Sequence, residues 1–142
     1  MRSSLIAATA LLALAGCSRK PAMVSDSAEA QRLARITIPA SAAGLQCRTE
    51  FGIDPLTYGR FDIPAADLPA VLDRMPKDRK VVPYSGYSNV TSHRMSEPWW
   101  RPDRLQEPRV AEWSEPGFSV NLMFGKSEES GVLTVYFFNF GL

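Results

Sequence analysis

The clearest pattern in the sequence is the alternation of apolar and polar positions near its C-terminus. Apolar side chains occupy every second position of residues 118–124, the period of a strand with one buried face. A polar segment between Gly125 and Gly131 follows, and residues 132–140 are then rich in β-branched and aromatic side chains. The pattern predicts a strand–loop–strand hairpin. Because its second strand is apolar on both faces, we place that strand centrally, with one face against a helix.

A second alternating pattern predicts another hairpin closer to the N-terminus. Leu45, Cys47, Thr49 and Phe51 alternate with charged or amide side chains. The turn cluster of residues 52–55 separates them from a returning strand over residues 56–63.

A short helix should follow this hairpin. Asp67 is a favourable N-cap, Pro69 falls within the first turn, and Pro76 ends the helix. The apolar stripe of this helix is formed by Leu68, Val71, Leu72 and Met75.

Residues 83–117 show neither the period of a strand nor that of a helix. They are rich in proline and place Trp99, Trp100 and Trp113 among charged groups. We expect a long irregular region that aromatic side chains hold in place. Taken together, the elements predict an α+β fold: a small antiparallel sheet of about four or five strands, one short helix and a long Pro/Trp-rich loop.

The N-terminal residues have the composition of an export signal. Arg2 precedes the uncharged run 5–14, and Leu14-Ala15-Gly16-Cys17 follows it. The run is too short for a transmembrane helix, which needs about 20 residues, and matches the apolar part of a secretory signal. In these four residues the chain resembles bacterial lipoprotein precursors, whose lipobox has this form. The resemblance implies that Cys17 is acylated (with palmitate or a similar acyl chain) and becomes the first residue of the mature protein.

We therefore divide the chain into three parts. Residues 1–16 are the lipoprotein signal peptide, residues 17–35 a lipidated tether, and residues 36–142 a single globular α+β domain. The residue after the lipidated cysteine is Ser18. In bacterial lipoproteins, aspartate at this position implies retention in the inner membrane. By the same resemblance, serine at this position favours an outer-membrane anchor with the domain facing the periplasm.

A second resemblance lies within the mature chain. Residues 60–69, with the sequence RFDIPAADLP, and the later Trp99-Trp100-Arg101-Pro102 are similar to patterns in small uncharacterised bacterial proteins. In those proteins an R-F-x-x-P segment leads into a D-L helix, and a W-W-x-P motif follows. The resemblance implies that strand, helix and tryptophan loop form one domain, and it implies no activity.

Composition excludes several classes of function. The chain has 16 basic and 15 acidic side chains, and Arg2 leaves with the signal peptide, so no basic surface for nucleic acid is expected. His93 is the only histidine, and Cys47 is expected to be a buried thiol, or alternatively to pair between molecules. The sequence contains no metal-ligand spacing, no phosphate-binding glycine motif and no nucleophile motif. We predict no metal site, no cofactor and no enzymatic activity.

Acidic and basic side chains alternate in the irregular region. This pattern is more typical of a solvated, self-paired surface than of the paired carboxylates of a hydrolase. The residues concerned are Glu97, Asp103, Glu107, Glu112 and Glu115, with Arg94, Arg101, Arg104 and Arg109.

The adjacent Trp99 and Trp100 are the best candidates for a binding surface. Trp and Arg are enriched at binding hot spots, and aromatic rings also stack on sugars. Arg94, Arg101, Tyr84 and Tyr87 could extend this surface. The alternative, which we favour, is that one or both tryptophans hold the loop onto the sheet. For Trp113 we favour a core role more strongly.

We expect a non-enzymatic, membrane-anchored lipoprotein that binds a protein or another envelope component. One alternative, by analogy with small anchored domains, is a periplasmic immunity or inhibitor protein against a toxin or lytic enzyme. A cell-wall hydrolase is the least favoured alternative.

Overall fold

The protein is one antiparallel sheet of seven strands, as described by a computed structural model of residues 21–142. The strand order is β1-β2-β3-β7-β6-β5-β4. The strands are β1 Ala22–Met23, β2 Ala43–Glu50, β3 Leu56–Pro64, β4 Val82–Pro83, β5 Gln106–Glu115, β6 Phe118–Lys126 and β7 Val132–Gly141. The helical elements are α1 Ser27–Ala34, α2 Leu68–Val71 and α3 Asn89–Ser92, with the 3-10 turns η1 Ala65–Asp67 and η2 Pro102–Arg104.

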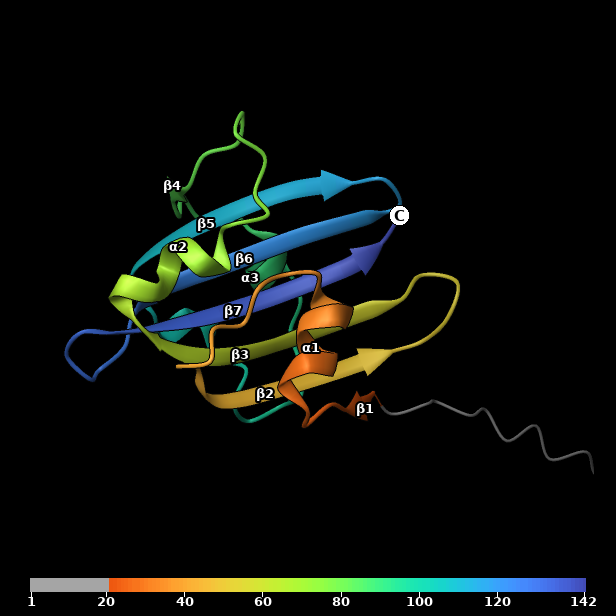
Figure 1. Cartoon of the computed structure of the whole chain (residues 1–142), viewed down its shortest axis with the longest axis horizontal. Helices are drawn as coiled ribbons and strands as arrows, with labels where there is room; N and C mark the ends of the chain where they lie inside the picture. Colours follow the sequence, from red (N-terminus) through yellow and green to blue (C-terminus); the bar gives the residue numbers. More distant parts are fainter. Residues whose placement is uncertain (1–20) are drawn as a thin grey trace, which may run out of the picture.

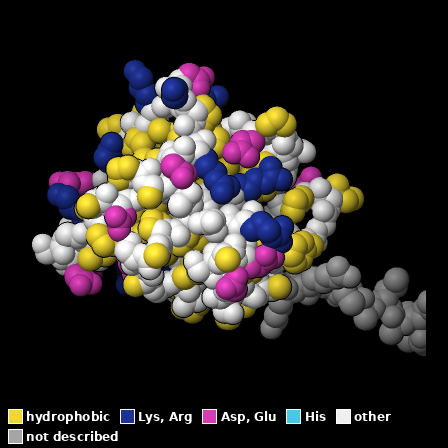
Figure 2. Space-filling model, in the orientation of Figure 1, with side chains coloured by type: hydrophobic (Ala, Val, Ile, Leu, Met, Phe, Trp, Pro, Cys, Tyr) yellow, Lys and Arg dark blue, Asp and Glu magenta, His cyan; other side chains and the backbone are white. Residues whose placement is uncertain are grey.

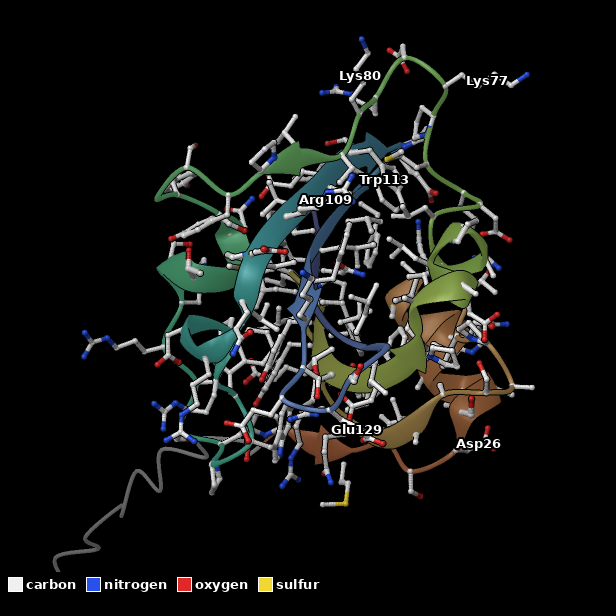
Figure 3. All side chains as sticks on the ribbon, turned by 90° about the vertical axis from the view of Figure 1, so that its left-hand side faces the viewer. Asp26, Lys77, Lys80, Arg109, Trp113 and Glu129 are labelled. Atoms are coloured by element: carbon white, nitrogen blue, oxygen red, sulfur yellow. The ribbon has the colours of Figure 1, made fainter. Side chains whose placement is uncertain are left out.

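The helices lie on both faces of the sheet. Figure 1 shows α1 and α2 in front of the sheet, on what we call the front face, and α3 behind it, on the back face. Figure 3 shows the same three layers from the side, with the sheet between them. Each face carries its own group of buried apolar side chains.

The predicted fold class is wrong, because the protein is dominated by its sheet and has seven strands in place of four or five. The largest missing element is β5, which lies in the region expected to be irregular. Glu107 has a φ of 49° and the register of β5 against β6 shifts between Gln106 and Arg109, which breaks the alternation. The two-residue edge strands β1 and β4 were also missed, since two residues carry no readable period.

Both predicted hairpins are confirmed. β2 pairs with β3, and β6 pairs with β7, in antiparallel register. The central position of the last strand is confirmed too, because β7 lies between β3 and β6. At Gly59 of β3 an added Cβ would lie 2.5 Å from Cζ of Phe137 and still closer to the carbonyl oxygen of Gln46. Only glycine lets these backbones and the buried ring approach so closely.

The front face holds the larger core. Its fully buried side chains include Phe61, Leu122, Phe124, Val135 and Phe137. The predicted helix after Asp67 forms but is shorter, and Asp67 accepts a hydrogen bond from the Ser41 hydroxyl without capping it. Residues 65–81 cross this face between β3 and β4, and Val71 is fully buried there.

Residues 22–34, which the sequence analysis assigned to the tether, pack against the front face. Asp26 caps α1 by accepting a hydrogen bond from the backbone N–H of Glu29 at 2.8 Å. Ala30 and Ala34 are fully buried, and these small side chains let α1 lie close to β2, β3 and β7. The folded body therefore extends to Ala22.

The back face is covered by residues 84–105, which we call the crossing segment. It leaves edge strand β4, reaches as far as β2 through an ion pair of Glu97 with Arg48, and returns to β5. The buried side chains of this face include Tyr58, Val90, Met123, Tyr136 and Phe138. The crossing segment carries the tryptophan pair.

Candidate functional site

Trp100 anchors the crossing segment to the back face. Its side chain is 6% exposed, and its ring meets Tyr58 and Tyr136 edge-on at centroid distances of 5.6 and 5.3 Å. Trp113 is 2% exposed within the front-face core, and Figure 3 shows it on the α2 side of the sheet. The favoured prediction is confirmed for these two tryptophans, which fill the core.

Trp99 lies in a different environment from its neighbour. It is half-buried and stacks on Tyr58 with centroids 6.0 Å apart and planes 25° apart. The Tyr136 hydroxyl accepts a hydrogen bond from the Arg101 backbone N–H at 3.3 Å and donates to the Trp99 carbonyl at 3.4 Å. Burial raises the pKa of Tyr136, so this hydroxyl keeps its proton at neutral pH and fixes the backbone around Trp99.

Beside Trp99 is a hollow of about 310 Å³, which we call the arginine hollow. It lies at the end of the sheet where β6 turns into β7, at the left in Figure 1. Side chains from the sheet, the crossing segment and the end of β6 line it, chief among them Arg60, Trp99, Arg101, Arg104, Lys126 and Tyr136. Four of these six are cationic.

Acidic neighbours neutralise three of the four cations. The pairs are Arg60–Asp62 at 2.8 Å, Arg101–Asp103 at 3.0 Å and Lys126–Glu107 at 2.6 Å. The Arg101 guanidinium lowers the pKa of the Asp103 carboxyl, so that pair stays ionised at neutral pH. Arg104 forms no ion pair with any residue in the described range 21–142. Glu128 is the one acidic side chain in the lining.

Arg60 is the most rigidly held of these cations. Its Nη2 donates to Asp62 at 2.8 and 2.9 Å, and Asp62 also accepts from the Thr134 hydroxyl at 2.6 Å. The guanidinium lies 5.7 Å from the centre of the Tyr136 ring. Its Nε is buried and has no hydrogen-bond partner within the described chain. Leaving a buried donor unpaired is costly, and because this atom is buried it is not open to a ligand in the hollow.

The other predicted binding residues lie apart from the arginine hollow. Arg94 borders a second hollow of about 510 Å³, next to His93 and Trp100. The Tyr84 hydroxyl donates to the Thr91 hydroxyl at 3.2 Å, and Tyr87 is 71% exposed. Of the predicted set, Trp99 and Arg101 line the arginine hollow and Trp100 packs beneath them.

The alternating charges of residues 94–115 are paired mainly with groups from other parts of the chain. Glu97 accepts a hydrogen bond from the Tyr58 hydroxyl at 3.0 Å and lies 3.3 Å from Nε of Arg48. Glu115 lies 3.7 Å from Arg35, and Arg101–Asp103 is the one ion pair formed within the segment. The expected self-paired surface is therefore wrong, because most of these charges pair with residues outside the segment or form no ion pair within residues 21–142.

The remaining reactive groups are not assembled into a site. His93 is exposed and stacks on Phe138 at 4.3 Å, while Cys47 is 2% exposed on the front face. Burial raises the pKa of the Cys47 thiol to about 12, which makes it a poor nucleophile and confirms the buried thiol. Among residues 21–142 no three His, Cys, Asp or Glu side chains lie close enough to hold a metal ion.

The sequence analysis missed four residues of the arginine hollow as members of a binding site: Arg60, Arg104, Lys126 and Tyr136. They come from three segments far apart in the chain, so no local pattern joins them. Arg60 opens the R-F-x-x-P pattern noted above, but a pattern in one strand does not tell which loop will cover it.

Comparison of the chain with protein-family models, curated proteins and solved structures found no match. The described residues contain no helix long and apolar enough to cross a membrane. The predicted signal peptide and the predicted lipidation site, Cys17, lie outside the described residues.

Proposed function

We propose that this chain is a lipid-anchored, non-enzymatic binding protein of the bacterial envelope, and that the arginine hollow binds an acidic envelope component. The observation that carries the proposal is that Arg104, which forms no ion pair within residues 21–142, lines one hollow of about 310 Å³ together with the half-buried Trp99. The anchor rests on the resemblance of residues 14–17 to a lipobox, and Ser18 in place of aspartate favours an outer-membrane location facing the periplasm.

The chemistry of the hollow favours a saccharide that carries a carboxylate or a phosphate. Guanidinium groups bind both anions through paired hydrogen bonds, and within residues 21–142 the Arg104 guanidinium has no acidic partner. The indole of Trp99 offers a flat apolar surface beside these donors, as sugar-binding sites do. Acidic saccharides are a chemical class that an envelope protein meets at high local concentration.

The test uses the full-length acylated protein in detergent micelles, with the three indole N–H groups observed by NMR. Glucuronic acid and glucose 1-phosphate are the acidic probes, and glucose is the neutral one. We expect the Trp99 signal to shift with both acidic sugars and to shift less with glucose. Trp100 and Trp113 are buried and act as internal references.

Arg104→Ala should weaken binding of the acidic sugars roughly tenfold, since a hydrogen bond to a charged group contributes about 1.5 kcal/mol. Arg79→Ala is the matched control, because Arg79 is an exposed arginine in the loop before β4. Equal shifts with all three sugars, or equal affinities of the two variants, contradict the acidic-saccharide proposal. If the protein crosslinks to one envelope protein and binds none of the sugars, its partner is a protein and the acidic-saccharide proposal is wrong.

A further inference from the structure

Exposed apolar side chains gather at the end of the sheet opposite the arginine hollow. Met23, Phe51, Ile53 and Leu142 are 62, 65, 100 and 71% exposed, and only two other large apolar side chains of the described chain are similarly exposed. We call these four residues the apolar end. A large apolar group in water is unfavourable, so a cluster of them marks a surface that is covered in use.

Backbone pairing brings these four residues together from three parts of the chain. Met23 of β1 pairs with Arg48, near the end of β2, and Phe51 and Ile53 lie in the loop that follows β2. The Gly141 N–H donates to the Pro55 carbonyl at 2.8 Å, which places Leu142 beside the same loop. Figure 1 shows β1, this loop and the C-terminus at the right-hand end, where Figure 2 shows apolar side chains on the surface.

We propose that the apolar end lies in the interfacial layer of the bilayer that holds the lipid anchor. This rests on the proposed acylation of Cys17. We infer that the bilayer covers this surface because the chain between the anchor and the folded body is short. Four residues lie between Cys17 and Ala22, and the five Cα–Cα steps, at no more than about 3.6 Å each, reach roughly 18 Å.

This short connection ends at the apolar end itself. Ala22 pairs with Thr49, two residues before Phe51, so the anchor cannot move far from the loop that carries Phe51 and Ile53. The anchor therefore raises the concentration of lipid at these side chains far above that met by any free partner. Apolar side chains such as phenylalanine and leucine insert at the boundary between headgroups and acyl chains in proteins that lie on a membrane surface.

The charges around the apolar end indicate how it binds. Glu50 and Asp54 are exposed on either side of Phe51 and Ile53, so the loop itself is not attracted to anionic lipid. Insertion of apolar side chains should consequently depend little on salt or on the fraction of anionic lipid. β7 runs from the arginine hollow to the apolar end, so this orientation directs the hollow away from the membrane.

The experiment places an environment-sensitive NBD fluorophore on the full-length acylated protein through Ile53→Cys. Glu129→Cys, in the exposed β6–β7 loop at the hollow end (Figure 3), is the matched control. Cys47 is buried with a raised thiol pKa, and the proposed acyl chain occupies Cys17, so the label goes to the new cysteine. The protein is reconstituted into vesicles of phosphatidylethanolamine with a minority of phosphatidylglycerol, and separately into phosphatidylcholine.

We expect the label at position 53 to be quenched by nitroxides on the lipid acyl chains, and to be severalfold less quenched by aqueous iodide than the label at position 129. The same result should hold in both lipid mixtures and in high salt. If both labels respond alike to iodide, the apolar end is not inserted. If position 53 is shielded from iodide but untouched by lipid nitroxides, a protein covers it, and the proposal is overturned.

Flotation separates this inference from the anchor on which it rests. A protein that fails to float with the vesicles lacks the anchor, and the proposed function then fails first. A protein that floats while its position 53 stays in water keeps the anchor and refutes only the membrane-facing end.

Discussion

Replacing Asn139 by alanine should strongly destabilise the protein, because this side chain joins α1 to the centre of the sheet. Asn139 is fully buried in β7. Its Nδ2 donates to the Ala34 carbonyl at 2.6 Å, at the end of α1, and its Oδ1 accepts from the Asn121 backbone N–H at 2.8 Å. The last carbonyls of a helix have no partner within the helix, so the Asn139 side chain takes that role for Ala34.

Alanine at position 139 leaves two buried backbone groups without partners. Each such group costs about 1–3 kcal/mol, so the free energy of unfolding should fall by about 2–6 kcal/mol. A domain of this size is stable by only about 5–15 kcal/mol, so the variant should be close to unfolding at room temperature.

Urea denaturation followed by tryptophan fluorescence measures this loss. Ser114→Ala, an exposed polar-to-alanine change on β5, is the control and should alter stability by less than about 0.5 kcal/mol. Hydrogen exchange should quicken most at Asn121 and in α1. A loss below about 1 kcal/mol for Asn139→Ala, or unchanged exchange in α1, would refute the reasoning.

Three further predictions concern packing and pH. Burial raises the pKa of Cys47 from 9.0 to about 12, so as pH rises its thiol ionises in the unfolded chain before it does so in the folded protein. The free energy of unfolding should therefore fall as pH rises through that range. If urea denaturation shows the same decline for Cys47→Ala, the prediction is contradicted. Gly59→Ala should lower the free energy of unfolding by about 3 kcal/mol through overpacking, whereas Gly52→Ala, with no atom near its added Cβ, should be nearly neutral in the same assay. Trp100→Ala should cost about 3–5 kcal/mol, and Trp99→Ala only about 1 kcal/mol while weakening sugar binding; a greater loss of stability from Trp99→Ala contradicts the assignment of roles.

The hairpins could be predicted because the pairing strands are close in sequence and keep a period of two. In β6, Val120, Leu122 and Phe124 face one core while Asn121 and Met123 face the other side. β5 could not be predicted in this way, since its bulge at Glu107 shifts the alternation and charged side chains occupy its exposed positions. The docking of α1 was also hidden, because two buried alanines and the distant Asn139 hold this helix, and the sequence of residues 17–35 has few large apolar side chains.

The candidate site was predictable only in part, for a similar reason. Trp99 and Arg101 lie two residues apart in the crossing segment, so composition alone marked them. Arg60 and Lys126 join them only because the crossing segment returns over β3 and β7 beside the end of β6. Which of two neighbouring tryptophans is buried depended on Tyr58 and Tyr136, two strand residues that are distant in sequence.

The local features of this protein could be derived from its sequence alone: the two hairpins, the central last strand with two apolar faces, and the burial of Cys47. These features follow from the period and polarity of short segments, which are properties of residues close together in the sequence and do not depend on the compact fold. Only the tertiary structure decided the number of strands, the docking of α1, the arginine hollow and the apolar end. Each of these depends on groups far apart in the chain, whose hydrogen bonds and contacts exist only once the whole sheet has formed.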